Sequence, residues 1–468
     1  MALADPAPHT AALRRWLSIV GIGEDGIDGL TPVARSLVSG AEIVFGGKRH
    51  LALGAPLIRG TVRPWPSPFG GAIDAVLAER GRAVCVLASG DPFVYGVGSI
   101  LARHVDPQDM LAVPAPSAFS LAAARLGWAL PETATLSLHA RAVDLIRPHL
   151  HPGQRVLALT SDGDGPAAVA QLLAQSGFGQ SRVSVLEALG GARERIRATI
   201  AARFALGDID DLNVVAVEVV AEPGARIIPR ASGLPDALFE HDGAITKREL
   251  RAVTLSSLAP RNGELLWDIG AGAGSVAIEW MLATPMQRAI AIEARPDRAA
   301  RIARNAAALG VPGLDIVSGE APAALSGLPG PDAIFIGGGA NRPGLLDAAV
   351  AALAPGGRLV VNAVTLATEA ALIARHARLG GELIRIAISR AEALALPHPP
   401  LQGEGRVGAE APSPPPGPLT GTDLPSPGGG VRHSALPCDV LAQATEARPS
   451  SIVCRPALPV TQWVWVKP

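Results

Sequence analysis

Short apolar runs typical of β-strands alternate with alanine- and arginine-rich runs typical of α-helices along most of this chain. Such alternation favours α/β architecture with mainly parallel sheets. The alternation resets once, because the strand-like run 213–220 is followed by a stretch rich in proline and glycine before a helix is expected to open near Thr246. We therefore predict two α/β domains, at residues 14–228 and 244–468, joined by a linker at 229–243.

Composition excludes several classes of protein. The 468 residues contain 41 Lys and Arg against 42 Asp and Glu, a balance that argues against a nucleic-acid-binding protein. Uninterrupted apolar runs stay shorter than the ~18 residues of a membrane span, and the N-terminus lacks the apolar core of a secretory signal. We expect a cytoplasmic protein. Cys85, Cys438 and Cys454 show no C-x-x-C spacing, so we expect neither disulfides nor a metal site.

Proline and glycine crowd residues 397–430. Such a stretch buries too little apolar surface to offset its ordering entropy, which predicts a disordered insertion at about 394–455. After it, residues 459–466 alternate with period two and are rich in aromatic and β-branched residues, which indicates a strand. We expect the insertion to interrupt a final antiparallel hairpin in which residues 382–390 pair with residues 459–466.

A glycine-rich loop lies at the start of the second domain. The run 265–279 is typical of a strand, a loop containing Gly270, Gly272 and Gly274, and a helix start; such glycines let a ligand approach the backbone. Dinucleotide-binding proteins use the spacing G-x-G-x-x-G, whereas here the third glycine comes one residue earlier. The spacing argues against a nicotinamide-dependent reductase, which remains a rival interpretation. Asp268, two residues before the loop, would suit a cationic ligand.

Two later strands also end in carboxylates. Glu293 ends the strand-like run 289–293, where it can accept hydrogen bonds from both hydroxyls of a ribose. Glu320 and Ala321 follow another strand. With the loop, these segments resemble the Rossmann-like S-adenosylmethionine methyltransferases, and the resemblance implies adenine contacts for Glu320 and Ala321. The implied cofactor-binding residues of this half are Thr246, Asp268, Gly270, Ala271, Gly272, Ala273, Gly274, Glu293, Glu320 and Ala321.

Two segments of the first domain, 16–23 and 82–99, are strands that run into loops containing glycine, and both tips should meet at the carboxyl edge of one sheet. A third segment, 114–128, supplies hydroxyls at a helix start. A helix is expected to start at Thr31 with proline at its first position. The segments resemble the tetrapyrrole (precorrin) methylase family, whose two-subdomain fold binds S-adenosylmethionine. For Ser117 and Ser120, helix capping is the other interpretation. The implied cofactor-binding residues are Gly21, Gly23, Ser89, Gly90, Asp91, Pro92, Ser117 and Ser120.

The fusion of these two halves is similar to the decarboxylating precorrin-6Y C5,15-methyltransferase family of cobalamin (vitamin B12) biosynthesis. This resemblance implies a tetrapyrrole methylase fold followed by a Rossmann-like fold whose mostly parallel sheet ends in an antiparallel hairpin. It implies methylation of precorrin-6Y at C5 by the first half, and at C15 with decarboxylation of the ring C acetate by the second, giving precorrin-8. It also makes a homo-oligomer plausible. Two alternatives stay open: another tetrapyrrole as substrate, or one active half with the other as a binding scaffold.

A substrate with several carboxylates calls for fixed cations, arginine above all. A solvated surface position is the other interpretation for each basic residue taken singly. His139 is a candidate for the first cleft, without a catalytic role. Methyl transfer from a sulfonium needs mainly in-line positioning, so we assign no catalytic residue and no metal. The candidate carboxylate-binding residues are Lys48, Arg49, Lys247, Arg248, Arg251 and Arg342.

Overall fold

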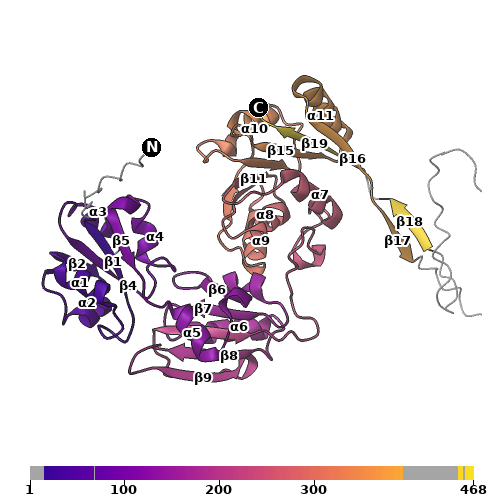
Figure 1. The fold of residues 1–468 in the computed structure, drawn as a ribbon. Coiled ribbons are helices and arrows are strands. Elements are labelled where there is room, and N and C mark those ends of the chain that lie inside the picture. The colour runs from indigo at the N-terminus through magenta and orange to yellow at the C-terminus, as the bar shows by residue number, and fades with distance from the viewer. Residues whose placement is uncertain (1–14, 68, 394–451, 457–458) are drawn as a thin grey trace, which may run out of the picture. The chain divides into compact units, whose positions relative to one another are not determined.

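The computed structural model describes residues 15–67, 69–393, 452–456 and 459–468, which are drawn in colour in Figure 1. They form one sheet of seven strands, two of five strands and a separate two-stranded hairpin. One compact unit contains Met1–Ile384 with Thr461–Pro468, and the other contains Arg385–Val460. Because the larger unit spans residues 229–243, the division at that linker stays a prediction.

The first sheet is entirely parallel, with strand order β3-β2-β4-β1-β5. Every residue of the interior strand β1 is buried, as expected for a parallel strand covered on both faces. Helix α1 starts after Thr31, whose hydroxyl accepts from the Ala34 amide at 3.2 Å, which confirms the predicted start. The elements are β1 (Leu17–Ile22), α1 (Pro32–Gly40), β2 (Ile43–Gly46), α2 (Lys48–Gly54), β3 (Thr61–Pro64), α3 (Ala72–Leu77), β4 (Val84–Ser89), α4 (Val97–Leu101), the 3₁₀ helix η1 (Pro107–Asp109) and β5 (Met110–Val113).

The second sheet, β6-β7-β10-β8-β9, is mixed. Only β6 and β7 are parallel, and the other three neighbouring pairs are antiparallel. Strand–helix alternation did not predict this, because β8, β9 and β10 follow one another without the crossover helix that parallel neighbours need. The elements are α5 (Ala118–Leu126), η2 (Leu130–Glu132), β6 (Thr133–Ser137), η3 (Val143–His149), β7 (Arg155–Leu159), α6 (Gly165–Gln175), β8 (Arg182–Glu187), β9 (Arg195–Ile200), η4 (Ala201–Arg203) and β10 (Asn213–Glu218).

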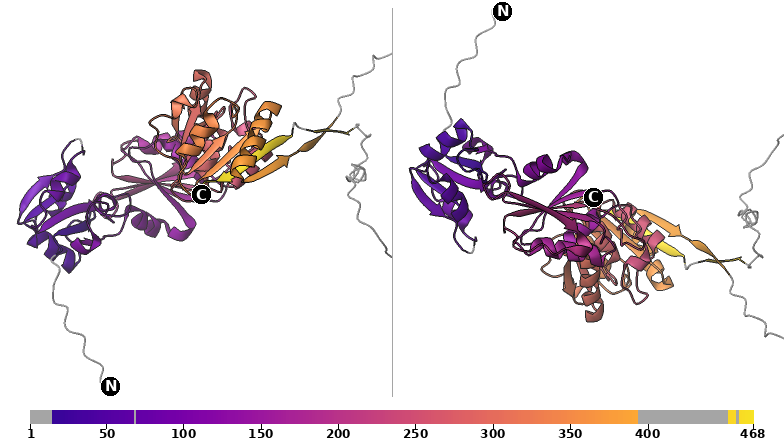
Figure 2. Two further views of the ribbon diagram at one scale, coloured as in Figure 1. Left: turned by 90° about the horizontal axis from the view of Figure 1, so that it is seen from above. Right: turned by 90° about the horizontal axis from the view of Figure 1, so that it is seen from below.

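The third sheet has the order β13-β12-β11-β14-β15-β19-β16. Strands β11 to β15 are parallel and β19 is antiparallel to β15, as the predicted fold class requires. Helices α7, α8 and α9 pack on one face, and α10 and α11 on the other (Figures 1 and 2). The elements are η5 (Asp236–Leu238), α7 (Arg248–Leu258), β11 (Leu265–Ile269), α8 (Ser275–Ala283), β12 (Arg288–Glu293), α9 (Pro296–Ala308), β13 (Asp315–Ser318), η6 (Ala323–Leu325), β14 (Ala333–Ile336), α10 (Leu345–Ala352), β15 (Arg358–Ala363), α11 (Leu366–Leu379), β16 (Glu382–Ile386) and β19 (Val460–Val466).

The expected closing hairpin is present, since β16 neighbours β19. It is shorter than predicted, because residues 389–393 form a separate strand, β17 (Ser389–Ala393), paired with β18 (Ile452–Pro456). Strand β18 corrects the end of the predicted insertion: the β-branched Ile452 and Val453 favour a strand, and β17 supplies its backbone partners. The rest of the predicted insertion, residues 394–451, lies outside the described residues, as does Cys438.

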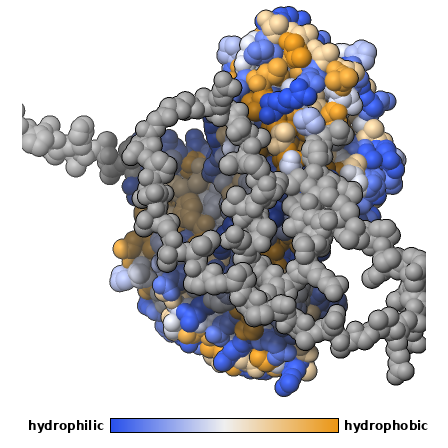
Figure 3. Space-filling model, turned by 90° about the vertical axis from the view of Figure 1, so that its right-hand side faces the viewer, coloured by the Kyte–Doolittle hydropathy of each residue, from blue (hydrophilic) through white to orange (hydrophobic). Residues whose placement is uncertain are grey.

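The described residues contain no helix long and apolar enough to cross a membrane. On the face drawn in Figure 3, hydrophilic and hydrophobic residues lie side by side on the coloured surface. Within the same described ranges, no group of three or more His, Cys, Asp and Glu side chains is arranged to hold a metal ion. Cys85 is a buried free thiol.

Candidate functional site

Three loops meet at the carboxyl edge of the first sheet. The Gly90 amide, after β4, donates to the Ile22 carbonyl at the end of β1 at 3.2 Å. The Ala115 amide, after β5, donates to the Gly90 carbonyl at 3.1 Å. A Cβ atom on Gly21 would collide with the Gly90 carbonyl oxygen and lie 2.6 Å from the Ala115 nitrogen. Gly21 is therefore required for the close approach of these backbones.

A pocket of about 400 Å³ opens at this edge, and residues of the second sheet form part of its wall. Gly21, Pro92 and Ser120 do not line it. Ser117 is the N-cap of α5 and accepts from the Ser120 amide at 3.1 Å, so the capping interpretation is confirmed for this serine. The predicted residues that the structure brings together around the pocket are Gly23, Ser89, Gly90, Asp91 and Ser117, with His139.

A polar cluster lies on one wall of this pocket. The Arg49 guanidinium forms an ion pair with Glu24, donates to the Ser89 hydroxyl at 2.7 Å and lies 2.8 Å from His50 Nε2. Burial, together with the Arg49 charge, lowers the pKa of His50 to about 4, so its imidazole is neutral at physiological pH. Arg49, a candidate for binding substrate carboxylates, thus lies at the pocket with its charge already balanced by Glu24.

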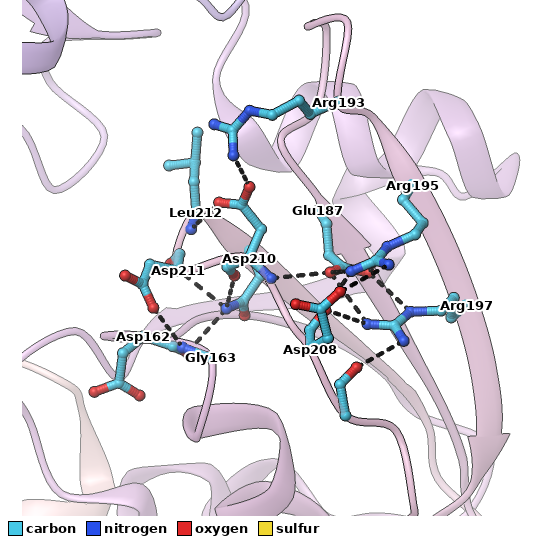
Figure 4. A network of polar contacts seen from close by, with 12 residues as sticks. Asp162, Gly163, Glu187, Arg193, Arg195, Arg197, Asp208, Asp210, Asp211 and Leu212 are labelled. Carbon is cyan, nitrogen blue, oxygen red and sulfur yellow. Dashed lines mark hydrogen bonds and ion pairs between the residues drawn. The ribbon is translucent and has the colours of Figure 1, made fainter.

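Another part of the wall adjoins an ionic network around the buried Glu187 (Figure 4). Glu187, at the end of β8, is fully buried and accepts hydrogen bonds from the guanidinium groups of Arg195 and Arg197 on β9. It also accepts from the Asp210 amide at 3.0 Å. These bonds tie the loop before β10 to the β8–β9 hairpin, and the pocket is lined by Asp211 and Leu212 at the end of that loop and by Asn213 at the start of β10. The network therefore fixes the shape of this wall.

The glycine loop of the second half links β11 to α8. Gly270, Gly272 and Gly274 have φ angles of 73°, 60° and 75°, in the left-handed region that favours glycine. The Gly270 amide donates to the Ile292 carbonyl at 2.9 Å, and the Gly272 amide donates to Glu293 Oε2 at 2.8 Å. The loop is thereby fixed to the carboxyl end of β12, and Glu293 lies directly beneath it.

Two buried carboxylates support this loop. Each oxygen of Glu293 accepts one backbone N–H and keeps a lone pair for a further donor. Asp268 is 1% exposed; its Oδ2 accepts from the Ala277 amide at 3.0 Å, whereas its Oδ1 has no partner among the described residues. Burial raises the pKa of Asp268 to about 7, and the Glu293 charge adds to the rise against the Ala277 hydrogen bond. This environment suits a ligand that brings a cation and hydrogen-bond donors.

The segment before α7 lies against the glycine loop, since a Cβ atom on Gly272 would lie 2.9 Å from the Ala244 carbonyl oxygen. Thr246 is two residues further on, and its carbonyl oxygen accepts from the Arg251 guanidinium. Helix α7 begins slightly later than predicted, at Arg248. The structure therefore brings the segment of Thr246 next to the predicted glycine loop.

Arg251, one of the candidate carboxylate-binding residues, is neither exposed nor unpaired, so the surface interpretation is wrong for it and its charge is already compensated inside the fold. It is fully buried, and its guanidinium pairs with Glu279, lies 3.1 Å from Asp236 Oδ1 and stacks 4.8 Å from the centre of the Phe239 ring. The reason is its place on the inward face of α7, where a buried arginine needs carboxylate partners. Arg251 instead holds the segment that contains Thr246.

Glu320 and Ala321 follow Gly319, whose amide donates to the Glu293 carbonyl at 3.0 Å. Glu320 is exposed and forms an ion pair with Arg342, in the loop between β14 and α10. Glu320, Ala321 and Arg342 line an open cavity of about 1020 Å³ beside α10. Glycine-loop residues 270–274 do not line this cavity.

Comparison with known proteins finds a methyltransferase family match for each half of the chain. Residues 17–204 match the model of the Tetrapyrrole (Corrin/Porphyrin) Methylases, and residues 237–398 match the Precorrin methyltransferase domain. A Sinorhizobium protein named precorrin-6Y C(5,15)-methyltransferase (decarboxylating) is 61% identical over 381 residues, which are 81% of this chain and 92% of that protein. The chain belongs to this family.

Two Salmonella typhimurium proteins match smaller parts of this precorrin-6Y C5,15-methyltransferase family member. A cobalt-precorrin-7 C(5)-methyltransferase is 31% identical over 180 residues, covering 38% of this chain and 88% of its own. A cobalt-precorrin-6B C(15)-methyltransferase (decarboxylating) is 36% identical over 137 residues, covering 29% of this chain and 70% of its own. The two position-specific names that this family joins are thus carried by separate proteins in Salmonella.

Several pocket residues of this methyltransferase were not selected from the sequence. Glu24 and His50 adjoin Gly23 and Arg49, which were candidates, so proximity along the chain was a usable signal. Thr160 follows β7, and residues 211–213 lie at or just before the start of β10, so all of them belong to the second sheet or the loops next to it. No local signal could have found these, because which strands of that sheet meet the first sheet depends on tertiary packing.

The buried Asp268 makes the stability of this methyltransferase depend on pH. Its pKa rises from 3.8 to about 7 on folding, so the folded chain binds the proton more tightly than the unfolded chain. The free energy of unfolding should therefore fall as the pH rises from about 4 towards about 7. Thermal unfolding at several pH values should show a smaller fall for Asp268→Asn. The exposed Asp315→Asn is the matched control, and parallel curves for wild type and Asp268→Asn would contradict the expectation.

Proposed function

We propose that this chain uses S-adenosylmethionine to methylate precorrin-6Y at C5 in its N-terminal half and at C15 in its C-terminal half. Decarboxylation of the ring C acetate accompanies the second methylation, and the product is precorrin-8. The observation that carries the proposal is that one family member contains two unrelated methyltransferase units, each with its own ligand-binding loop at a sheet edge. The names and matching lengths of the two Salmonella proteins support the assignment of one position to each half.

The residues present fit S-adenosylmethionine in both halves. In the first half, Gly23, Ser89–Asp91 and Ser117 would hold it in a pocket whose volume is typical of cofactor sites. In the second, residues 270–274 and Glu293 would hold it, and the free Oδ1 of Asp268 suits a cationic group. Bound there, the cofactor supplies an electrophilic methyl group.

The reaction calls for positioning by this chain more than for proton transfer. The bridge carbons of a reduced tetrapyrrole are nucleophilic, so an in-line approach to the methyl donor is the main requirement. The fixed loops of both sites would hold the methyl donor in position for this approach, since each loop is tied to a neighbouring strand end by hydrogen bonds of its backbone. In the decarboxylation, the electron pair of the broken carbon–carbon bond passes into the conjugated macrocycle and carbon dioxide leaves; a proton from solvent then converts the remaining methylene group into a methyl group. We assign no residue of this chain as a general base.

Isothermal titration with S-adenosylhomocysteine tests the two-site proposal. We expect two sites per wild-type chain, and one in the Gly272→Arg, Glu293→Ala double variant, because the arginine would fill the loop and the alanine would remove its carboxylate support. Glu382→Ala, at the exposed start of β16, is the control and should keep both sites. A single wild-type site that the double variant abolishes would contradict a cofactor site in the first half.

Turnover separates the proposal from its alternatives. Mass spectrometry of wild-type product from precorrin-6Y should show two added methyl groups and the loss of one carbon dioxide. Two cofactor sites without this product would favour another tetrapyrrole substrate. One added methyl group would favour one active half with the other as a binding scaffold.

A further inference from the structure

The N-terminal pocket is too small for the substrate of the proposed function, on which this inference rests. Its volume of about 400 Å³ lies within the range for one small ligand such as a cofactor. A tetrapyrrole macrocycle with its acid side chains is much larger than S-adenosylmethionine. If the cofactor fills the pocket, the macrocycle has to bind at the rim, so the rim residues decide how it is held.

An exposed aromatic ring lies at this rim, just after the Gly-Asp-Pro loop. Tyr95 is 53% exposed and follows the pocket residue Val94. Its ring contacts Phe119, another pocket residue, edge to face at 6.2 Å. The backbone of Tyr95 has a φ angle of 55°, which a bulky residue rarely adopts, and such strain concentrates at functional positions. The loop thus presents a large apolar ring beside the pocket.

A guanidinium group lies over the same ring. Arg141 is exposed, and its guanidinium carbon is 6.0 Å from the centre of the Tyr95 ring. The turn that carries it contains Ala140, with a φ angle of 54°, and is held by a 2.9 Å hydrogen bond from the Ala140 amide to the Ser161 hydroxyl. His139 in this turn lines the pocket. Arg141 has no ion pair within the described part of the chain.

We propose that Tyr95 and Arg141 bind the tetrapyrrole for C5 methylation. The Tyr95 ring stacks on the conjugated macrocycle, and Arg141 binds one of its peripheral carboxylates. Aromatic rings stack on flat conjugated ligands, and the planar fork of arginine matches a carboxylate. Arg49 and Arg193, near the same pocket, are already paired with Glu24 and Asp210. Arg141 therefore offers the uncompensated charge that an anionic substrate requires.

Steady-state kinetics of the full chain test the role of Arg141. Arg141→Gln should raise the KM for precorrin-6Y in C5 methylation on the order of tenfold, with kcat and the affinity for S-adenosylhomocysteine unchanged. Arg141→Lys should recover part of the loss, because it keeps the charge without the fork. Arg103→Gln, an exposed arginine with no ion pair among the described residues, is the matched control.

The outcomes separate this inference from the proposed function. If wild type does not methylate precorrin-6Y, the proposed function fails. If wild type is active and Arg141→Gln keeps its KM, the substrate role of Arg141 is overturned. An equal loss of affinity for S-adenosylhomocysteine would also overturn it, because Arg141 would then act by shaping the cofactor pocket.

Two substitutions test the ring. Tyr95→Phe keeps the ring and should keep the wild-type KM. Tyr95→Asn removes the ring but tolerates a positive φ angle, so it should raise the KM with the fold preserved. An unchanged KM in Tyr95→Asn would overturn the stacking role.

Discussion

A Gly21→Ala variant should lose S-adenosylhomocysteine binding in the N-terminal half, and C5 methylation with it. The added methyl group would collide with the Gly90 carbonyl oxygen and lie 2.6 Å from the Ala115 nitrogen. Both are backbone atoms at the point where three loops cross, so they cannot turn away as a flexible side chain can. Relief requires the Gly-Asp-Pro loop to move, which breaks the 3.1 Å hydrogen bond between Ala115 and Gly90. Overpacking of this kind costs about 1–3 kcal/mol or more.

Titration with S-adenosylhomocysteine measures this effect directly. One site per chain, belonging to the C-terminal half, should remain in Gly21→Ala. Gly40→Ala is the matched control: a Cβ atom at Gly40 meets nothing within 4 Å, so both sites should be retained. Two sites of wild-type affinity in Gly21→Ala would show that the loop crossing tolerates a side chain. Gly21 would then not be required for the close approach of these backbones.

An Arg251→Met variant should lower the free energy of unfolding by about 3–5 kcal/mol, because it leaves a buried carboxylate without its cation. That carboxylate, Glu279, also accepts the amides of Gly233 and Leu234 at 2.7 and 3.0 Å. Arg251 further binds the Thr246 carbonyl oxygen. Loss of the guanidinium should therefore release the segment that lies on the glycine loop and reduce C15 methylation as well as stability.

Urea denaturation followed by tryptophan fluorescence tests this expectation, since Trp267 and Trp280 are buried in the same half. Arg304→Met is the control: it removes an exposed ion pair with Glu240, and such pairs contribute at most about 1 kcal/mol. Equal losses of stability in the two variants would contradict this expectation, because the buried Arg251–Glu279 pair would then contribute no more to the free energy of unfolding than an exposed pair.

Local features of the chain predicted much of the fold. The Thr31–Pro32 pair marked the start of α1, because capping and the fixed φ angle of proline act within one turn. The glycines at 270, 272 and 274 marked the loop between β11 and α8, where positive φ angles are needed. Glu293 was expected at the end of a strand and lies there, beneath that loop.

Predictions failed where the answer depended on packing between distant segments. Arg251 has the sequence context of a surface cation, yet its partners Asp236 and Glu279 come from η5 and α8. The antiparallel pairing of β8, β9 and β10 was likewise not predicted, because hydrophobic periodicity indicates a strand but not its partner or their relative direction.

The sequence alone therefore determined the fold class, the start of α1, the glycine loop between β11 and α8 and the resemblance to two methyltransferase families, because these depend on residues close together in the chain. Only the tertiary structure decided which side chains are buried, paired or exposed. It balances the charge of Arg49 with Glu24, buries Arg251 and places Arg141 over Tyr95, where it has no ion pair with any described residue. The physical reason is that burial and charge compensation depend on neighbours that folding brings together from distant parts of the chain.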